Sequence, residues 1–264
     1  MTEIVDAIEI FKNKKIISTN LINRTFEYFN KFRGKYFIVK PSLPILYFGD
    51  IDAYSGSQRK IVTVGKNPSD NEFRLSKSDK YSFCRFPEWD EERGKLIQTL
   101  NSYFEQKPLK QWFSSFEPIL NGLNSSFYKN GQYNNIAIHT DICSPLATNP
   151  TWSKLAREEQ EQLFKDGFAL WKSLIEELQP DIILISVPYK LFKHVIQTKG
   201  TAILTFDTCK DGKPRKRNYT VFQHAWKIND TKEAIVVYGQ AANKSFDTIS
   251  DEQKRQIGGK INYA

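Results

Sequence analysis

The stretch Ile61-Val62-Thr63-Val64-Gly65-Lys66-Asn67-Pro68-Ser69 says most about the fold of this chain. Its first four residues are β-formers, and such a short apolar run is typical of a buried strand. The Gly-X-Asn-Pro sequence that follows ends a strand abruptly and places polar side chains at its carboxyl end. In an open α/β sheet that end is where ligands bind. The alternative is an ordinary strand followed by a turn, because Asn-Pro and Pro-Ser are common in turns.

Strands and helices alternate along the chain on either side of this stretch. Strands are predicted at residues 135–140, 181–186, 201–206, 219–222 and 234–239, and helices at 3–32, 91–104, 112–123, 154–179 and 189–197. Strands separated by helices indicate a parallel sheet with both faces covered. The expected fold class is α/β, a three-layer α/β/α domain with a mostly parallel central sheet and an N-terminal helical extension. We predict one domain over residues 1–264, with the extension at 1–58 and the core at 59–250.

The composition is that of a globular protein. Of 264 residues, 40% are hydrophobic and 14% aromatic, which excludes a disordered chain. No apolar run approaches the ~20 residues that cross a bilayer, and the acidic residues of the start, 1–6, are unlike a signal peptide. Cys84, Cys143 and Cys209 are too scattered for a disulfide framework or a metal site. We therefore expect a cytoplasmic protein with no membrane partner and no metal.

The formal net charge of +8 indicates a polyanionic partner, because phosphate attraction is a common reason for an excess of Lys and Arg. The alternative is a soluble basic protein without such a partner. Residues 210–217 carry five basic residues, among them Arg215, Lys216 and Arg217, against one acid. Since the segment joins two strand-like runs, we predict a basic hairpin tip that contacts a nucleic-acid backbone or groove. A solvated loop is the alternative.

Three predicted strands end in polar motifs: Gly65-Lys66-Asn67-Pro68-Ser69, His139-Thr140-Asp141-Ile142-Cys143 and Gly239-Gln240-Ala241-Ala242-Asn243-Lys244-Ser245. In order and in placement at strand ends they resemble the motifs of the uracil-DNA glycosylase superfamily. That family has a Gly-X-Asp/Asn-Pro loop after its first core strand, a base-recognition motif after a middle strand, and a His-Pro-Ser-like loop after a late strand. The resemblance covers residues 61–246. It implies a DNA glycosylase that hydrolyses the N-glycosidic bond of a flipped-out base, with 59–250 as the catalytic core.

The resemblance assigns roles to the first motif. Asn67 occupies the slot in which the family positions the attacking water, and as an amide it would orient water rather than act as a strong base. Asp70, or Glu72 close to it, could supply a carboxylate; the alternative is that both are loop charges facing solvent. Gly65 and Lys66 would adjoin the base.

Aromatic residues follow at 81–87, where the family places a ring that stacks on the flipped base. Stacking of this kind is worth ~1–3 kcal/mol per base. Phe83 is the first candidate, with Phe86 and Tyr81 behind it. The alternative is that these rings fill the core, as Phe most often does.

Asp141 says most about the substrate. The family typically carries an Asn here that donates to O4 of uracil and accepts from N3–H. An ionised Asp only accepts, so it suits the amino group of cytosine and not uracil O4. We therefore expect a modified cytosine in foreign (phage) DNA, since removal of ordinary cytosine would destroy the host genome. The alternative is that Asp141 caps a turn or that the register differs.

The third motif departs most from the family pattern, because no His follows Tyr238 to stabilise the leaving base. Gln240 or Asn243 could donate a neutral hydrogen bond instead. We assign Gln240, Asn243 and Lys244, with Ser69 of the first motif, to DNA contact.

His139 and His224 are the remaining imidazole candidates for the site, with His194 behind them. A lone His beside apolar residues is more often a core group, which is the interpretation we favour for both. The missing strand-end His concerns the mechanism more than the fold.

Three other functions stay open: a repair glycosylase that excises uracil, a DNA-binding member of the fold without catalysis, and an enzyme acting on free nucleotides. The last lacks a Gly-rich phosphate loop and clustered metal-binding carboxylates. Three scattered cysteines cannot hold an iron–sulfur cluster, which takes four thiolates. We expect no cofactor, DNA as the partner and a monomer.

Overall fold

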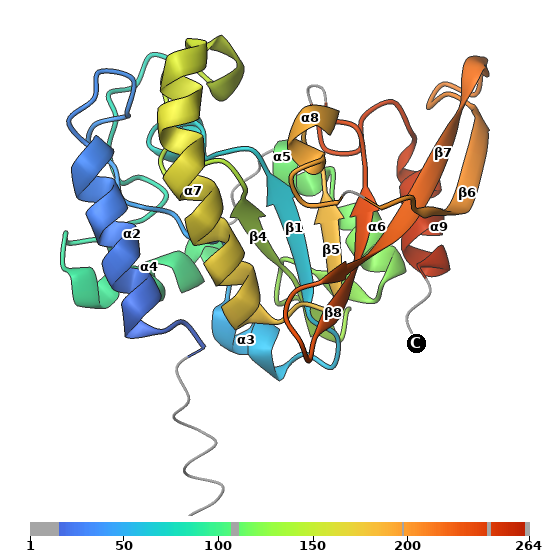
Figure 1. Ribbon diagram of the computed structural model, residues 1–264, viewed down its shortest axis with the longest axis horizontal. Coiled ribbons are helices and arrows are strands. Elements are labelled where there is room, and N and C mark those ends of the chain that lie inside the picture. The colour runs from blue at the N-terminus through green and yellow to red at the C-terminus, as the bar shows by residue number, and fades with distance from the viewer. Residues whose placement is uncertain (1–15, 107–110, 197, 242–243, 262–264) are drawn as a thin grey trace, which may run out of the picture.

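The computed structural model describes residues 16–106, 111–196, 198–241 and 244–261, which form a mixed α/β fold around one central sheet (Figure 1). The sheet consists of β1 (Ile61–Gly65), β4 (Ile138–Asp141), β5 (Ile182–Ile185), β6 (Thr201–Thr208), β7 (Pro214–Lys227) and β8 (Glu233–Tyr238). Their order is β4-β1-β5-β8-β7-β6. A separate parallel pair joins β2 (Ser125–Ser126) to β3 (Asn135–Ile136).

Four adjacent strands, β4, β1, β5 and β8, run parallel, which confirms the expected mostly parallel sheet. In the register of these strands Gly65 lies opposite Asp141, and Ile185 lies opposite Tyr238. The carboxyl ends of β1, β4 and β8, where the three polar motifs begin, therefore meet at one edge of the sheet.

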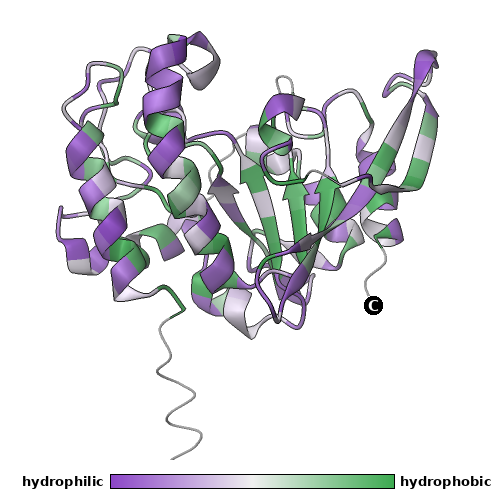
Figure 2. Cartoon of the chain, viewed as in Figure 1, coloured by the Kyte–Doolittle hydropathy of each residue, from purple (hydrophilic) through white to green (hydrophobic). Residues whose placement is uncertain are grey.

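The central parallel strands are buried: β1 and β5 are mostly apolar, whereas β4 also buries the polar residues His139, Thr140 and Asp141. All residues of β1, β4 and β5 are buried, and Figure 2 shows the hydrophobic strands in the middle of the fold. Strands buried on both faces read as continuous hydrophobic runs instead of alternating ones.

Helices contact both faces of β4. The Thr140 hydroxyl accepts a hydrogen bond from the indole of Trp171, on α7 (Arg157–Leu178), at 3.1 Å. The neighbouring His139 lies against Phe113 of α5 (Gln111–Ser114), with ring centroids 5.1 Å apart. Successive strand residues point to opposite faces, so α7 and α5 cover opposite sides of this strand.

The N-terminal segment packs on the core. Helix α2 (Thr19–Phe32) lies along α7, and Ser18 at its start donates to Glu177 through both its backbone and its hydroxyl. Beyond α2, Phe48 forms a β-bridge with His139, and the short helix α3 (Ile51–Gly56) leads into β1. The part of the predicted first helix at 3–15 lies outside the described residues.

Two predicted helices are interrupted. The segment predicted as one helix at 91–104 consists of η2 (Arg93–Lys95), α4 (Leu96–Asn101) and η3 (Tyr103–Gln106). The segment at 112–123 consists of α5 and α6 (Glu117–Gly122). The other short helices are η1 (Asp70–Glu72), η4 (Trp152–Lys154) and α8 (Tyr189–Phe192).

A helix that the sequence did not predict, α9 (Asp251–Lys260), lies beyond the predicted core boundary at 250. It packs directly on α6. A Cβ atom added to Gly122 would lie 2.3 Å from the carbonyl of Arg255, and one added to Gly258 would lie 2.2 Å from that of Ile119. The two helices approach this closely because both contact points are glycines.

The predicted hairpin is present, formed by β6 and β7. Because β7 is antiparallel to both β6 and β8, β6 runs in the direction of β8. The connecting residues 209–213 therefore lie at the same sheet edge as the three motifs, and Figure 1 shows the hairpin projecting there. Within the described ranges, no helix combines the length and the apolar character that crossing a membrane requires.

Candidate functional site

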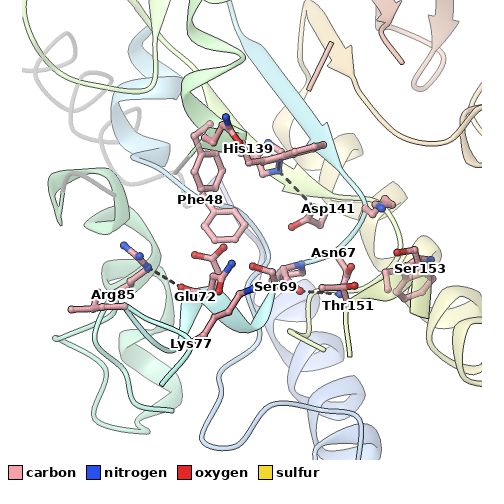
Figure 3. Close-up of a pocket in the computed structure, with 18 of the residues that line it drawn as sticks. Phe48, Asn67, Ser69, Glu72, Lys77, Arg85, His139, Asp141, Thr151 and Ser153 are labelled. Carbon is pink, nitrogen blue, oxygen red and sulfur yellow. Dashed lines mark hydrogen bonds and ion pairs between the residues drawn. The ribbon is translucent and has the colours of Figure 1, made fainter. Parts of the chain in front are cut away.

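A cavity of about 780 Å³ opens at the carboxyl ends of β1 and β4. Its walls come from the first motif, from the η1 loop, from α5, from the end of β4 and from residues 151–153. Six of the candidates named from the sequence line it: Lys66, Asn67, Ser69, Glu72, His139 and Asp141. Figure 3 shows Asn67 and Asp141 projecting toward the same space.

Backbone hydrogen bonds join the first two motifs beyond the strands. The Gly65 carbonyl accepts from Ile142 N at 3.0 Å, and the Lys66 carbonyl accepts from Cys143 N at 2.7 Å. Burial raises the pKa of the Cys143 thiol well above its usual range, so this cysteine stays protonated. The two backbone hydrogen bonds thus join the two motifs directly beyond the ends of β1 and β4.

Gly65 is required by the contact between these motifs. A Cβ atom at this position would lie 2.6 Å from Asp141 Oδ1 and 3.0 Å from His139 Nε2. Both side chains are nearly inaccessible to solvent, at 5% and 2% exposure. Glycine therefore makes room for the Asp141 carboxylate beside the first motif.

His139 is held behind Asp141 by polar contacts on both ring nitrogens. The Trp112 indole N–H donates to Nε2 at 3.3 Å, and Nδ1 lies 2.7 Å from the Thr63 hydroxyl. Since an indole only donates, Nε2 accepts and the proton of the neutral ring is on Nδ1. Asp141 Oδ1 lies 3.6 Å from Nε2, within ion-pair reach if the ring gains a second proton. His139 lines the cavity, whereas His194 and His224 do not.

Asn67 is oriented by its amide nitrogen. Nδ2 donates to the Thr148 hydroxyl at 3.0 Å and to the Pro68 carbonyl at 2.8 Å. Its Oδ1 accepts no hydrogen bond from the residues that the structure describes, and the side chain lines the cavity. The amide oxygen is therefore available to a water molecule or a ligand in the cavity.

The structure brings Glu72, and not Asp70, to the cavity. Asp70 forms an ion pair with Arg74 and accepts from the Tyr81 hydroxyl at 3.3 Å, outside the cavity wall. Glu72 is 2% exposed, lines the cavity and accepts from the Tyr103 hydroxyl. Burial raises the pKa of Tyr103 well above its usual range, so Tyr103 remains a donor. The prediction of Asp70 as a catalytic residue is not supported by its position.

None of the three candidate stacking residues, Phe83, Phe86 and Tyr81, lines the cavity. Phe86 is fully buried between Phe73 and Tyr103, at centroid distances of 5.7 and 5.5 Å. Phe83 packs edge-on against Phe73 and lines a second cavity. Both belong to an aromatic cluster that closes the back of the loop, because large rings gain most from burial.

Four other aromatic residues, which the sequence analysis missed, line the cavity: Phe48, Trp112, Phe113 and Trp152. Phe48 reaches it through the β-bridge to His139, so the N-terminal segment contributes to the site. Trp112 and Phe113 come from α5. Periodicity gave no signal for these residues, since their contacts with the motifs are long-range.

The third motif reaches the site indirectly. The Ser245 hydroxyl donates to the Trp112 carbonyl at 3.3 Å, and Ser245 N donates to the Ser115 hydroxyl at 3.0 Å. Gln240 is exposed and Lys244 is half-buried, and neither lines the cavity. Asn243 lies outside the described residues. Through Ser245 the loop thus binds the segment that carries Trp112, and Gln240 and Lys244 supply no side chain to the cavity wall.

The predicted basic residues of the hairpin divide into two kinds. Arg215 donates to the carbonyls of Thr208 and Thr248 and lies over the Tyr219 ring, so it holds the hairpin together. Lys216 and Arg217 are exposed and form no ion pair with any described residue. These two remain available to an external anion.

Among the described residues, no three His, Cys, Asp or Glu side chains are grouped closely enough to hold a metal ion. Comparisons with protein-family models, with curated proteins and with solved structures find no match to this chain.

Proposed function

We propose that this chain is a DNA glycosylase that hydrolyses the N-glycosidic bond of a flipped-out modified cytosine. The fold would be three-layered, α/β/α, with an N-terminal helical extension. The observation that carries the proposal is the meeting of two predicted motifs. Gly65 and Asp141 are register partners, and Asn67 and Asp141 line one cavity at the carboxyl edge of a parallel sheet.

The cavity contains the groups that such a hydrolysis needs. In the proposed reaction, the Oδ1 of Asn67 accepts a hydrogen bond from the attacking water, and Glu72, which lines the same cavity, takes its proton. The water oxygen bonds to C1′ as the bond from C1′ to the base breaks, and the bonding electrons leave with the base. Lys66 lines the cavity and offers a positive charge to that anion before it is protonated.

Asp141 and the cavity size support a modified cytosine. An ionised carboxylate accepts from the cytosine amino group and repels the O4 of uracil. The cavity, at about 780 Å³, lies in the upper half of the usual range for ligand sites, about 300–1,000 Å³. It therefore has room for a base that carries an added group, such as the sugar on the hypermodified cytosines of phage DNA.

The charge distribution supports DNA as the partner. The net charge is +8, and exposed Lys216 and Arg217 project from the hairpin at the edge that holds the cavity. Strands lie about 4.8 Å apart, so β6 is roughly 19 Å from β1, four strands away. With phosphates 3.4 Å apart along one strand, this span corresponds to about six nucleotides. We propose a monomer in the cytoplasm that binds duplex DNA along this edge.

The test uses end-labelled duplexes that contain uracil, cytosine, hydroxymethylcytosine or glucosylated hydroxymethylcytosine. Hot alkali converts abasic sites to strand breaks. We expect breaks only at a modified cytosine, and loss of them in Asn67→Ala. Breaks at uracil would retain a glycosylase and refute the role of Asp141. Binding without breaks on any substrate would refute catalysis and leave a DNA-binding protein. Asn67, at a position where the family can have Asp, would agree with that result.

A further inference from the structure

A second cavity, of about 550 Å³, lies between α2 and residues 83–93. It shares no lining residue with the first cavity. The loop after η1 separates the two, since Arg85 lines the first cavity and Phe83 lines the second. The excision chemistry proposed above uses none of its residues, so this site is a separate feature of the molecule.

Aromatic rings form much of its wall. Phe26 and Phe29 come from α2, and Phe83 and Trp89 come from the facing loop. Phe29 and Trp89 are each 8% exposed, whereas Phe26 and Phe83 are half-buried and present part of their surface. Phe83, which the sequence indicated as a base-stacking residue, thus lies in an aromatic-lined cavity, though not the expected one.

Cations surround these rings. The Arg33 guanidinium lies 5.3 Å from the Phe29 centroid, and that of Arg93 lies 4.9 Å from the Phe26 centroid. Lys40 also lines the cavity, and Glu91 is the one acidic residue in the wall. A guanidinium stacked on a ring is held in place while N–H groups at its edge can still donate to an anion. The wall therefore combines stacking surfaces with a net positive charge.

We propose that the second cavity binds a nucleotide, its base among the rings and its phosphate on Arg33, Arg93 and Lys40. Planar bases stack on aromatic side chains whatever their identity, and Arg and Lys bind phosphate oxygens. Two ligands share this chemistry: a single-stranded segment of DNA that passes around the loop between the cavities, and a free mononucleotide.

The experiment compares binding of a fluorescein-labelled ten-residue oligothymidylate and of unlabelled deoxythymidine monophosphate, by anisotropy and by calorimetry. The variant is Arg33→Gln/Arg93→Gln. The control is Lys35→Gln/Lys172→Gln, which removes the same charge at two exposed positions outside both cavities. We expect the first pair to weaken oligonucleotide binding at least tenfold and the control pair to change it less than twofold.

Phe83→Leu supplies an independent variant that keeps the charge and removes the ring, and at least fivefold weaker binding is expected. Tenfold loss for the oligonucleotide alone assigns the site to a DNA strand, and equal loss for the mononucleotide assigns it to a free nucleotide. Equal effects of the arginine and lysine pairs, together with an unchanged Phe83→Leu, would overturn the proposal. Those are the results expected if the ligand binds only in the first cavity, because neither Arg33 nor Arg93 lines the first cavity. Base excision is measured in parallel from the strand breaks that hot alkali produces. Failure of the nucleotide-binding proposal is therefore distinguished from failure of the proposed glycosylase function.

Discussion

Replacing Gly65 by alanine tests the contact between the first two motifs. The new Cβ would lie 2.6 Å from Asp141 Oδ1, closer than such atoms are found, and 3.0 Å from His139 Nε2. The carboxylate must then rotate toward the cavity, or His139 must shift among Phe48, Phe113 and the other rings around it. Overpacking of this kind costs ~1–3 kcal/mol. For a chain of this length, a loss of ~2 kcal/mol lowers Tm by roughly 4–8 °C.

The measurement is urea unfolding followed by tryptophan fluorescence, with Gly56→Ala as the control. Nothing lies within 4 Å of a Cβ at Gly56, so that variant is expected within ~0.5 kcal/mol of the parent or slightly more stable. Repeating Gly65→Ala in an Asp141→Ala background isolates the carboxylate. We expect the penalty to fall by at least half. An equal penalty in both backgrounds, or no penalty in the parent, would refute the reasoning.

Four further predictions follow from the site and its surroundings. Glu72→Gln is expected to slow excision at least ~100-fold and to keep the Tyr103 hydrogen bond. Asp70→Asn should lower Tm and leave the excision rate within about threefold. Equal excision rates for the two variants would contradict the assignment of the catalytic carboxylate to Glu72 instead of Asp70. Burial lowers the pKa of His224 from 6.5, so the unfolded chain takes up a proton near that pH before the folded one does. Stability should therefore fall as pH drops below about 6.5, and His224→Gln should reduce that fall in urea unfolding at pH 7.5 and 5.5. Lys210→Gln/Lys216→Gln/Arg217→Gln should lower the slope of log Kd against log salt for duplex DNA by about 2–3; an unchanged slope would remove the hairpin from the interface. Leu75 is 69% exposed at the cavity, and Leu75→Ala should reduce excision from duplex more than from single strands, at unchanged Tm, if it fills the gap left by a flipped base.

The central strands and the edge that holds the site could be predicted because their signals are local. Runs such as Ile61–Val64 and Ile182–Ile185 are short, rich in β-branched residues and followed by residues that end a strand. Parallel strands then bring their carboxyl ends together without further information. The adjacency of Gly65 and Asp141 follows from the fold class together with the strand order.

The remaining features depend on long-range contacts. Asp70 and Glu72 are two residues apart, and their partners differ: Arg74 and Tyr81 bind Asp70 outside the cavity, whereas Tyr103 donates to Glu72, which lines it. Helix α9 has no apolar stripe in its sequence and forms through close packing on α6 at glycines. Phe48 enters the site through a single bridge to β4. A periodic pattern carries none of this information.

The position of β1 at the middle of the parallel strands affects how the chain is made. Its neighbours, β4 and β5, follow it by about 75 and about 120 residues. At roughly 5–20 residues per second, about 6–24 s separate synthesis of β1 from synthesis of β5. During that time a mostly apolar segment has no partner on at least one side and is exposed to aggregation. Lower expression temperature, which slows aggregation of the exposed strand, should therefore raise the yield of folded protein.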